Sequence, residues 1–291
     1  MKKTFLLSVS LLLLLGLSLS VDGLNGAWAS EHPLKKVLRE NSMITKKSGN
    51  LKFSMPKTLN RSGQDSLIMR TKEGIRKSLE LINEPPLREA IHFLLVPNRN
   101  GMKGLYGAGI GGIFFAKDYK YYPEGAEPDE NLIYAIYGGK NNTLGHEITH
   151  MVTFLKWGDT NTLWLNEGLA TLSCPESMDC DGHTFEERYI YFLQNGKLYI
   201  PDLSNDFIME GNSLIQHKIF YSQTAYIVEC LINNYGIGKF KRLWQNGMNN
   251  FENIYGIPFK NFILKINEEL LNKYPKPFNF NLDGFSEDCV K

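Results

Sequence analysis

Short apolar runs and helical periodicity divide this 291-residue chain into two parts of different character. In the first part, short apolar runs between glycine, proline and asparagine residues predict strands. These runs cover residues 51–55, 91–97, 113–116 and 132–137, and an amphipathic helix is predicted over 66–81. From about residue 141 apolar residues recur every 3.6 positions, which predicts one helix after another, including 238–246 and 259–273. Strands first and helices afterwards indicate an α+β fold.

The first 29 residues have the pattern of a secretory signal peptide. Lys2 and Lys3 precede an apolar stretch over 5–19, and Ala27-Trp-Ala29 has the small-residue spacing at which such peptides are cleaved. An uncleaved anchor would need a longer uninterrupted apolar span. We therefore expect cleavage before Ser30 and an exported protein, periplasmic or extracellular, with no membrane span in the mature chain.

The remaining chain is expected to consist of a lead-in and one domain. Residues 30–50 are polar and rich in lysine, which predicts a flexible segment. Residues 51–291 are expected to form the domain, strand-rich to about 140 and helical from about 141. This length is sufficient for a full hydrophobic core, as one domain or as two sub-lobes.

Charge narrows the choice of partners. Removing residues 1–29 deletes two lysines and one aspartate, which takes the formal net charge from +1 to 0. A neutral balance gives no reason to expect nucleic acid or a charged membrane surface as partner. The sequence does not indicate an oligomeric state.

The segment 142–155 carries the strongest chemical signal. Its apolar residues repeat at helical spacing, so His146 and His150, four residues apart, would project from one face and could hold one metal ion. Glu147 would lie beside that metal, where a general base must stand to deprotonate a bound water. The alternative is a helix that carries two histidines by accident.

A second segment, 161–172, offers a third ligand. Hydrolytic zinc sites use three protein ligands and keep one position open for water. Glu167 follows His150 by 16 residues, in a short apolar segment where an unpaired buried carboxylate would be costly. An ordinary surface ion pair is the alternative for Glu167.

Together these two segments resemble the gluzincin zinc metallopeptidases, most closely the peptidase MA-like family related to thermolysin and the membrane alanyl aminopeptidases. The resemblance implies His146, His150 and Glu167 as ligands of one Zn²⁺ per chain and Glu147 as general base. It also implies that Asn166 supports the site from behind the ligands. The fold it implies is a small mixed sheet followed by a mainly helical zinc-binding half.

A third segment, 220–236, is similar to the family's next active-site helix. The alignment implies that Tyr221 donates a hydrogen bond to the oxyanion that forms during hydrolysis. His217 lies four residues earlier on the same face, and it could serve instead or orient Tyr221. Tyr226 is predicted to be a packing residue, and packing of both tyrosines is the alternative.

The expected function is an exported zinc-dependent peptidase that hydrolyses a peptide or protein substrate. Aminopeptidase relatives carry a glutamate in a glycine-rich turn, but the corresponding residues 106–113 contain no acidic residue, which favours an endopeptidase. The turn also lacks the lysine and hydroxyl residue of a phosphate-binding loop. A non-catalytic module that binds a peptide or partner on the same fold is the second hypothesis.

The four cysteines of an exported chain suggest disulfides, with three possible connectivities. We favour a bridge between Cys174 and Cys180, which bracket a short loop, while Cys230 is expected to be a core thiol. A second metal site formed by Cys174, Cys180 and His183 lacks a fourth ligand. His92 lies in an apolar strand and is predicted to be a packed core histidine.

Overall fold

The computed structural model describes residues 39, 42–97, 112–115, 131–137, 143–175, 182–197, 214–282 and 285. The predicted signal peptide, the glycine-rich turn over 107–111, Cys180 and Cys289 lie outside these residues. Contacts divide the chain into two compact units, and the division falls inside helix α4 (Leu144–Trp157), between Val152 and Thr153.

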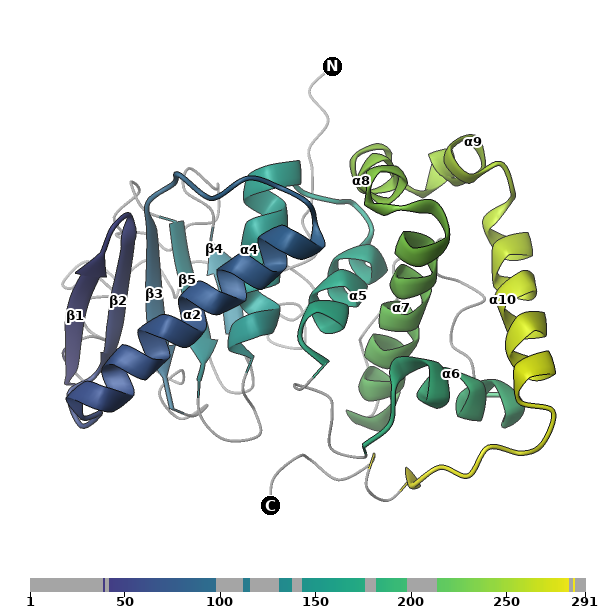
Figure 1. Ribbon diagram of the computed structural model, residues 1–291, viewed down its shortest axis with the longest axis horizontal. Coiled ribbons are helices and arrows are strands. Elements are labelled where there is room, and N and C mark those ends of the chain that lie inside the picture. Colours follow the sequence, from purple (N-terminus) through teal and green to yellow (C-terminus); the bar gives the residue numbers. More distant parts are fainter. Residues whose placement is uncertain are drawn as a thin grey trace, which may run out of the picture. The chain divides into compact units, whose positions relative to one another are not determined.

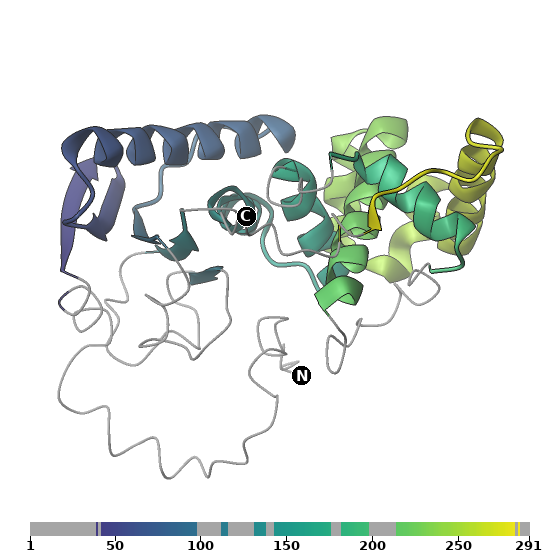
Figure 2. The same ribbon diagram turned by 90° about the horizontal axis from the view of Figure 1, so that it is seen from below.

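The first unit contains a five-stranded mixed sheet, visible in Figures 1 and 2. Its strands are β1 (Met43–Ser48), β2 (Leu51–Pro56), β3 (Ile91–Val96), β4 (Gly112–Phe115) and β5 (Asn131–Ile136), in the order β1-β2-β3-β5-β4. The three central strands β2, β3 and β5 run parallel, and β1 and β4 pair antiparallel at the two edges. The prediction of an α+β fold with a small mixed sheet is confirmed.

Strand β1 corrects one expectation. Residues 30–50 were predicted to be flexible, but Met43–Ser48 pair with β2 along their whole length, from Met43 opposite Pro56 to Ser48 opposite Leu51. The two strands are joined through Gly49, whose φ of 66° allows a tight turn. Cross-strand pairing therefore orders a lysine-rich segment at the sheet edge, in which Met43 is buried and only Thr45 and Lys47 are fully exposed.

Helix α2 (Arg61–Leu81) covers one face of the sheet (Figure 2). It begins five residues before the predicted start, because the Asn60 side chain accepts a hydrogen bond from Gly63 N and caps the first turn. Near its end, Ser78 Oγ and Thr149 Oγ1 form a buried hydrogen bond of 2.9 Å. That bond joins α2 to α4.

The core of the sheet is formed by β3 and β5, in which every residue is buried. Phe53 stacks on Phe93 with ring centroids 5.3 Å apart. His92 is 1% exposed, and its Nε2 lies 2.8 Å from Ser54 Oγ. Its burial confirms the prediction of a packed core histidine. Burial, with a smaller contribution from the charge of Lys52, also lowers the pKa of His92 to about 3.

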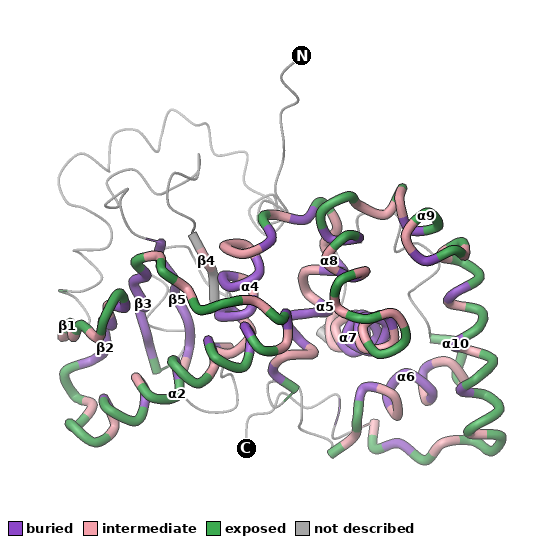
Figure 3. The backbone as a smooth tube through the Cα atoms, turned by 45° about the horizontal axis from the view of Figure 1, so that its top comes forward, coloured by how far each residue is buried: buried purple, intermediate pink, exposed green. Residues whose placement is uncertain are grey.

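The second unit is helical. After the C-terminal turn of α4 come α5 (Leu163–Ser173), α6 (Phe185–Gln194), α7 (Leu214–Tyr235), α8 (Ile237–Asn246), η7 (Met248–Asn250), α9 (Phe251–Tyr255) and α10 (Phe259–Lys273). The predicted helices over 238–246 and 259–273 are confirmed. Helix α7 packs against α5, α6 and α8, and Figure 3 shows its largely buried course. None of the described helices is long and apolar enough to cross a bilayer.

Residues after α10 pack back onto α6 and α7. Phe280 and Phe285 join Phe192 of α6 and Ile219 of α7 in one buried cluster. Lys218 Nζ donates a hydrogen bond of 3.1 Å to the carbonyl of Phe285. This C-terminal segment therefore covers the first turns of α7.

Candidate metal centre

His146 and His150 lie one turn apart on α4, and both are half-buried. Their Nε2 atoms are 2.9 Å apart, and the rings meet edge to face with centroids 4.6 Å apart. Helical spacing of four residues produces this convergence, as the sequence predicted. Two ring nitrogens that face one another at this distance can share a proton or a cation.

Glu147 belongs to the same turn of α4 and is 8% exposed. Its backbone N–H donates to the carbonyl of Thr143 at 2.9 Å, which places the residue at the start of the helix. A carboxylate near a helix N-terminus is favoured by the helix dipole. Glu147 is therefore a buried acid in the first turn of the helix that carries both histidines, and its role as a general base stays a prediction.

Glu167 is the third member of the group and comes from the first turns of α5. His146, His150 and Glu167 each offer one ligand atom, and these atoms all lie within 4.8 Å of one another. Among the described residues, this is the one group of three or more histidine, cysteine and acidic side chains that could hold a metal ion. The structure thus brings together the three predicted ligands.

The donor set fits zinc. Two nitrogens bound to a tetrahedral zinc ion at about 2.0–2.1 Å are about 3.3 Å apart. The observed separation of 2.9 Å requires only a small rotation of either ring to reach that value. Two imidazoles and one carboxylate, all half-buried, also match the ligand types of open hydrolytic zinc sites.

The flanks of Glu167 anchor α5 in the core of the helical unit. Leu165 and Leu169 are fully buried, and Trp164 stacks on Phe259 with ring centroids 5.6 Å apart. Asn166, predicted to support the site, is half-buried beside Glu167. Because the buried residues of α5 must face the core, the rotation of the helix about its axis is fixed.

His217 and Tyr221 lie four residues apart on α7, and both are half-buried. The spacing puts them on one face of the helix, as expected. Their predicted roles at the oxyanion remain predictions.

Tyr226 occupies a different face of α7 and is 7% exposed. Its ring centroid lies 4.9 Å from that of Tyr189, and its hydroxyl is hydrogen-bonded to the Cys230 thiol. Burial raises the pKa of Tyr226 and raises that of Cys230 to about 12. The prediction that Tyr226 is a packing residue is confirmed.

The cysteine predictions are tested only in part. Cys174, which follows α5, is 2% exposed. The favoured bridge joins it to Cys180, which lies outside the described residues, so that pairing stays a prediction. The side chain of Cys174 is enclosed in the core, so it contributes as a small apolar group. Cys230 is a half-buried thiol on α7.

Asp159, two residues after α4, is an acid that sequence reasoning passed over. Burial raises its pKa to about 6, against a smaller opposing effect of a hydrogen bond with the Thr160 backbone. Asp159 follows Gly158, and this sequence predicts an exposed turn. The burial of the Asp159 carboxylate could therefore not be predicted from the sequence. Asp159 is not a member of the metal-binding group.

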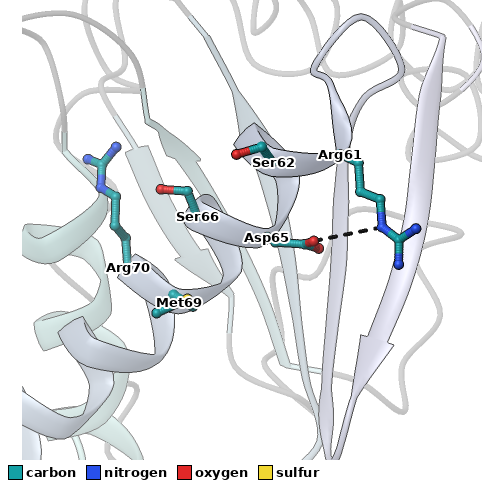
Figure 4. Close-up of a pocket in the computed structure, with 6 residues that line it drawn as sticks. All are labelled: Arg61, Ser62, Asp65, Ser66, Met69 and Arg70. Carbon is teal, nitrogen blue, oxygen red and sulfur yellow. Dashed lines mark ion pairs between the residues drawn. The ribbon is translucent and has the colours of Figure 1, made fainter.

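A hollow lies over the N-terminal half of α2, and Figure 4 shows the side chains around it. Arg61 and Asp65 approach within 4.0 Å there, and Met69 is 70% exposed. All of its lining residues come from one face of one helix. The hollow contains a single carboxylate and no histidine, so it lacks the groups of a metal site.

Neither comparison with protein-family models nor comparison with curated proteins finds a match for this chain. The assignment of a role therefore depends on the geometry of the residues themselves.

Proposed function

We propose that this protein is a zinc-dependent peptidase of the gluzincin type. One observation carries the proposal: His146, His150 and Glu167 present their ligand atoms within 4.8 Å of one another. Glu147 adds a buried carboxylate on the same helical turn as the histidines. Three ligands and an adjacent base are the parts that hydrolysis by an activated water requires.

His146, His150 and Glu167 would hold the ion. Zinc in such a site lowers the pKa of a bound water towards neutrality and polarises a carbonyl group. Glu147 would accept the proton of the attacking water and deliver it to the leaving amine nitrogen. Its burial excludes bulk solvent from the carboxylate, which favours proton transfer over loss of the proton to water.

On α7, the Tyr221 hydroxyl would donate a hydrogen bond to the oxyanion that develops on the substrate. His217, one turn away on the same face, is the second candidate for this role. Half-burial leaves both side chains within reach of a bound substrate.

We propose a peptide or protein as the substrate and an endopeptidase as the activity. Strand β4 is an edge strand in the sheet order, paired with β5. An edge strand offers backbone groups that can pair with an extended peptide. Cleavage of the predicted signal peptide would place the enzyme outside the cytoplasm.

Metal analysis and hydrolysis test the proposal together. The purified protein should contain one zinc per chain and should cleave an unfolded protein such as reduced casein. A chelator should abolish cleavage, and added Zn²⁺ should restore it. Metal binding without cleavage of any unfolded substrate would favour the non-catalytic binding module, and a protein that binds no divalent metal would overturn the proposal.

A further inference from the structure

Helices α5 and α7 lie side by side (Figure 1). They approach closely at Gly168 of α5, the residue after Glu167. A Cβ atom added at Gly168 would lie 2.8 Å from the carbonyl oxygen of Thr224, 2.9 Å from its carbonyl carbon and 2.8 Å from Val228 Cγ2. Side-chain carbons do not come so close to other heavy atoms. Two of the three obstructing atoms belong to the backbone of α7, so only a shift of a whole helix could make room.

Two other helical glycines show that this contact is specific to Gly168. A Cβ at Gly74 of α2 would meet the terminal Cδ1 of Ile148 at 2.9 Å, and a flexible side-chain end can turn aside. A Cβ at Gly238 of α8 would have nothing within 4 Å. Of these three helical glycines, Gly168 is therefore the one with the strongest steric need for glycine.

The contact bears directly on Glu167, because Glu167 and Gly168 are consecutive residues of one rigid helix. Buried Leu165 and Leu169 prevent α5 from rotating to relieve a clash. Any movement of α5 away from α7 would carry the Glu167 carboxylate with it.

The same contact is tied to the turn of α7 that carries Tyr221. Thr224 Oγ1 donates to the carbonyl of Phe220 at 2.9 Å and to that of Tyr221 at 3.1 Å. Thr224 is 1% exposed, so its backbone is enclosed as well as hydrogen-bonded. The part of α7 that contacts Gly168 is therefore held in place and cannot easily move aside.

We propose that Gly168 is a positioning residue for the metal ligand Glu167. Its contact with the Thr224 carbonyl sets how far the Glu167 carboxylate reaches. This inference rests on the proposed function, because it requires that Glu167 binds the metal.

Gly168→Ala tests it by the strength of metal binding. The affinity of the full chain for Zn²⁺ is measured by competition with a chelating dye, well below the unfolding temperature. The visible absorption of bound Co²⁺ reports the geometry of the site independently of any activity. We expect a 10- to 100-fold loss of Zn²⁺ affinity and an altered Co²⁺ spectrum, the range found when a group that orients a ligand is changed.

Two controls separate positioning from stability. Gly238→Ala makes the same substitution in open space and should leave affinity unchanged. Ile266→Ala on α10 removes buried volume, so it should lower the unfolding temperature while metal affinity stays within about twofold of the wild type.

If Gly168→Ala does not fold, Val228→Ile introduces a milder overlap from the α7 side and must show the same loss. Wild-type affinity and spectrum in a folded Gly168→Ala, or in Val228→Ile when that variant is used, would overturn the inference and leave the proposed function standing. Failure of the wild type itself to bind Zn²⁺ or Co²⁺ would overturn both.

Discussion

The histidine on strand β3 and the two histidines on helix α4 differ in their burial and in the partners of their ring nitrogens. His92 on β3 is 1% exposed, is held by Ser54, and has a pKa lowered to about 3 by burial. His146 and His150 on α4 are half-buried and turn their Nε2 atoms towards one another. The sheet keeps its histidine neutral and engaged in the core, whereas the helix presents two nitrogens to a common point. The surroundings of a histidine therefore decide whether its ring nitrogens are available to a metal ion.

The sharpest test of this comparison is removal of a histidine from each region. His146→Ala deletes one of three ligands, so we expect loss of bound zinc and of all peptidase activity. His92→Gln should retain the metal in full, because His92 is outside the metal-binding group. The zinc content of both variants is measured by mass spectrometry. Full zinc occupancy in His146→Ala would refute the assignment of His146 as a metal ligand.

Within α4, a substitution of the proposed base Glu147 should leave metal binding by the proposed ligands intact. Glu147→Gln keeps the size of the side chain and leaves the ligands in place, so zinc should be retained. Turnover should fall by about 10³-fold or more, because the amide cannot accept the proton of the attacking water. We would measure kcat on casein together with zinc content. A variant with unchanged kcat would show that the base lies elsewhere.

The pH dependence of stability should report His92 in the sheet. Its folded pKa of about 3 lies below the ordinary value of 6.5, so the unfolded chain binds the additional proton between these values. The stability that neutral His92 contributes is therefore present above about pH 6.5 and is lost as pH falls towards 3. The expected slope is about 1.4 kcal/mol per pH unit at most.

Urea unfolding of the wild type and of His92→Gln at pH 7, 5.5 and 4.5 measures this slope. Carboxyl groups contribute to both proteins, so only the difference between them is attributed to His92. Parallel pH dependence in the two proteins would contradict the burial of His92.

Helix α7 repeats the comparison with tyrosines, and the effect expected there is smaller. Tyr221 is half-buried, whereas Tyr226 is packed against Tyr189. Tyr221→Phe should lower kcat by about 10²-fold with little change in KM, because one oxyanion donor is lost. Tyr226→Phe should leave kcat nearly unchanged. The reverse result would show that the register of α7 has been misassigned.

Local patterns predicted most of the fold. The apolar runs at 51–55, 91–97 and 132–137 and the helical spacing after residue 141 correspond to observed elements. Strand β1 was missed because its lysines suggested a solvated tail, although the Gly49-Asn50 turn was a readable hairpin signal. The order of the strands depends on long-range pairing, which no local pattern contains.

Part of the candidate metal centre was predictable for a physical reason: helical spacing alone brings His146 and His150 together, whereas Glu167 was assigned with the help of the family resemblance. The Cys174–Cys180 bridge stays a prediction, because Cys180 lies outside the described residues. The contact of Gly168 with the Thr224 backbone joins helices far apart in the sequence, so it became visible only in three dimensions.

The C-terminal segment has a consequence for the order of events during synthesis. Lys218 at the start of α7 is bonded to Phe285, 67 residues later, and Ile219 shares a cluster with that phenylalanine. All three proposed ligands leave the ribosome long before these contacts can form. The contacts of Lys218 and Ile219 with the C-terminal segment are complete only once residue 285 has emerged. A nascent chain would thus possess its three proposed metal ligands well before the first turns of α7 have all their native neighbours.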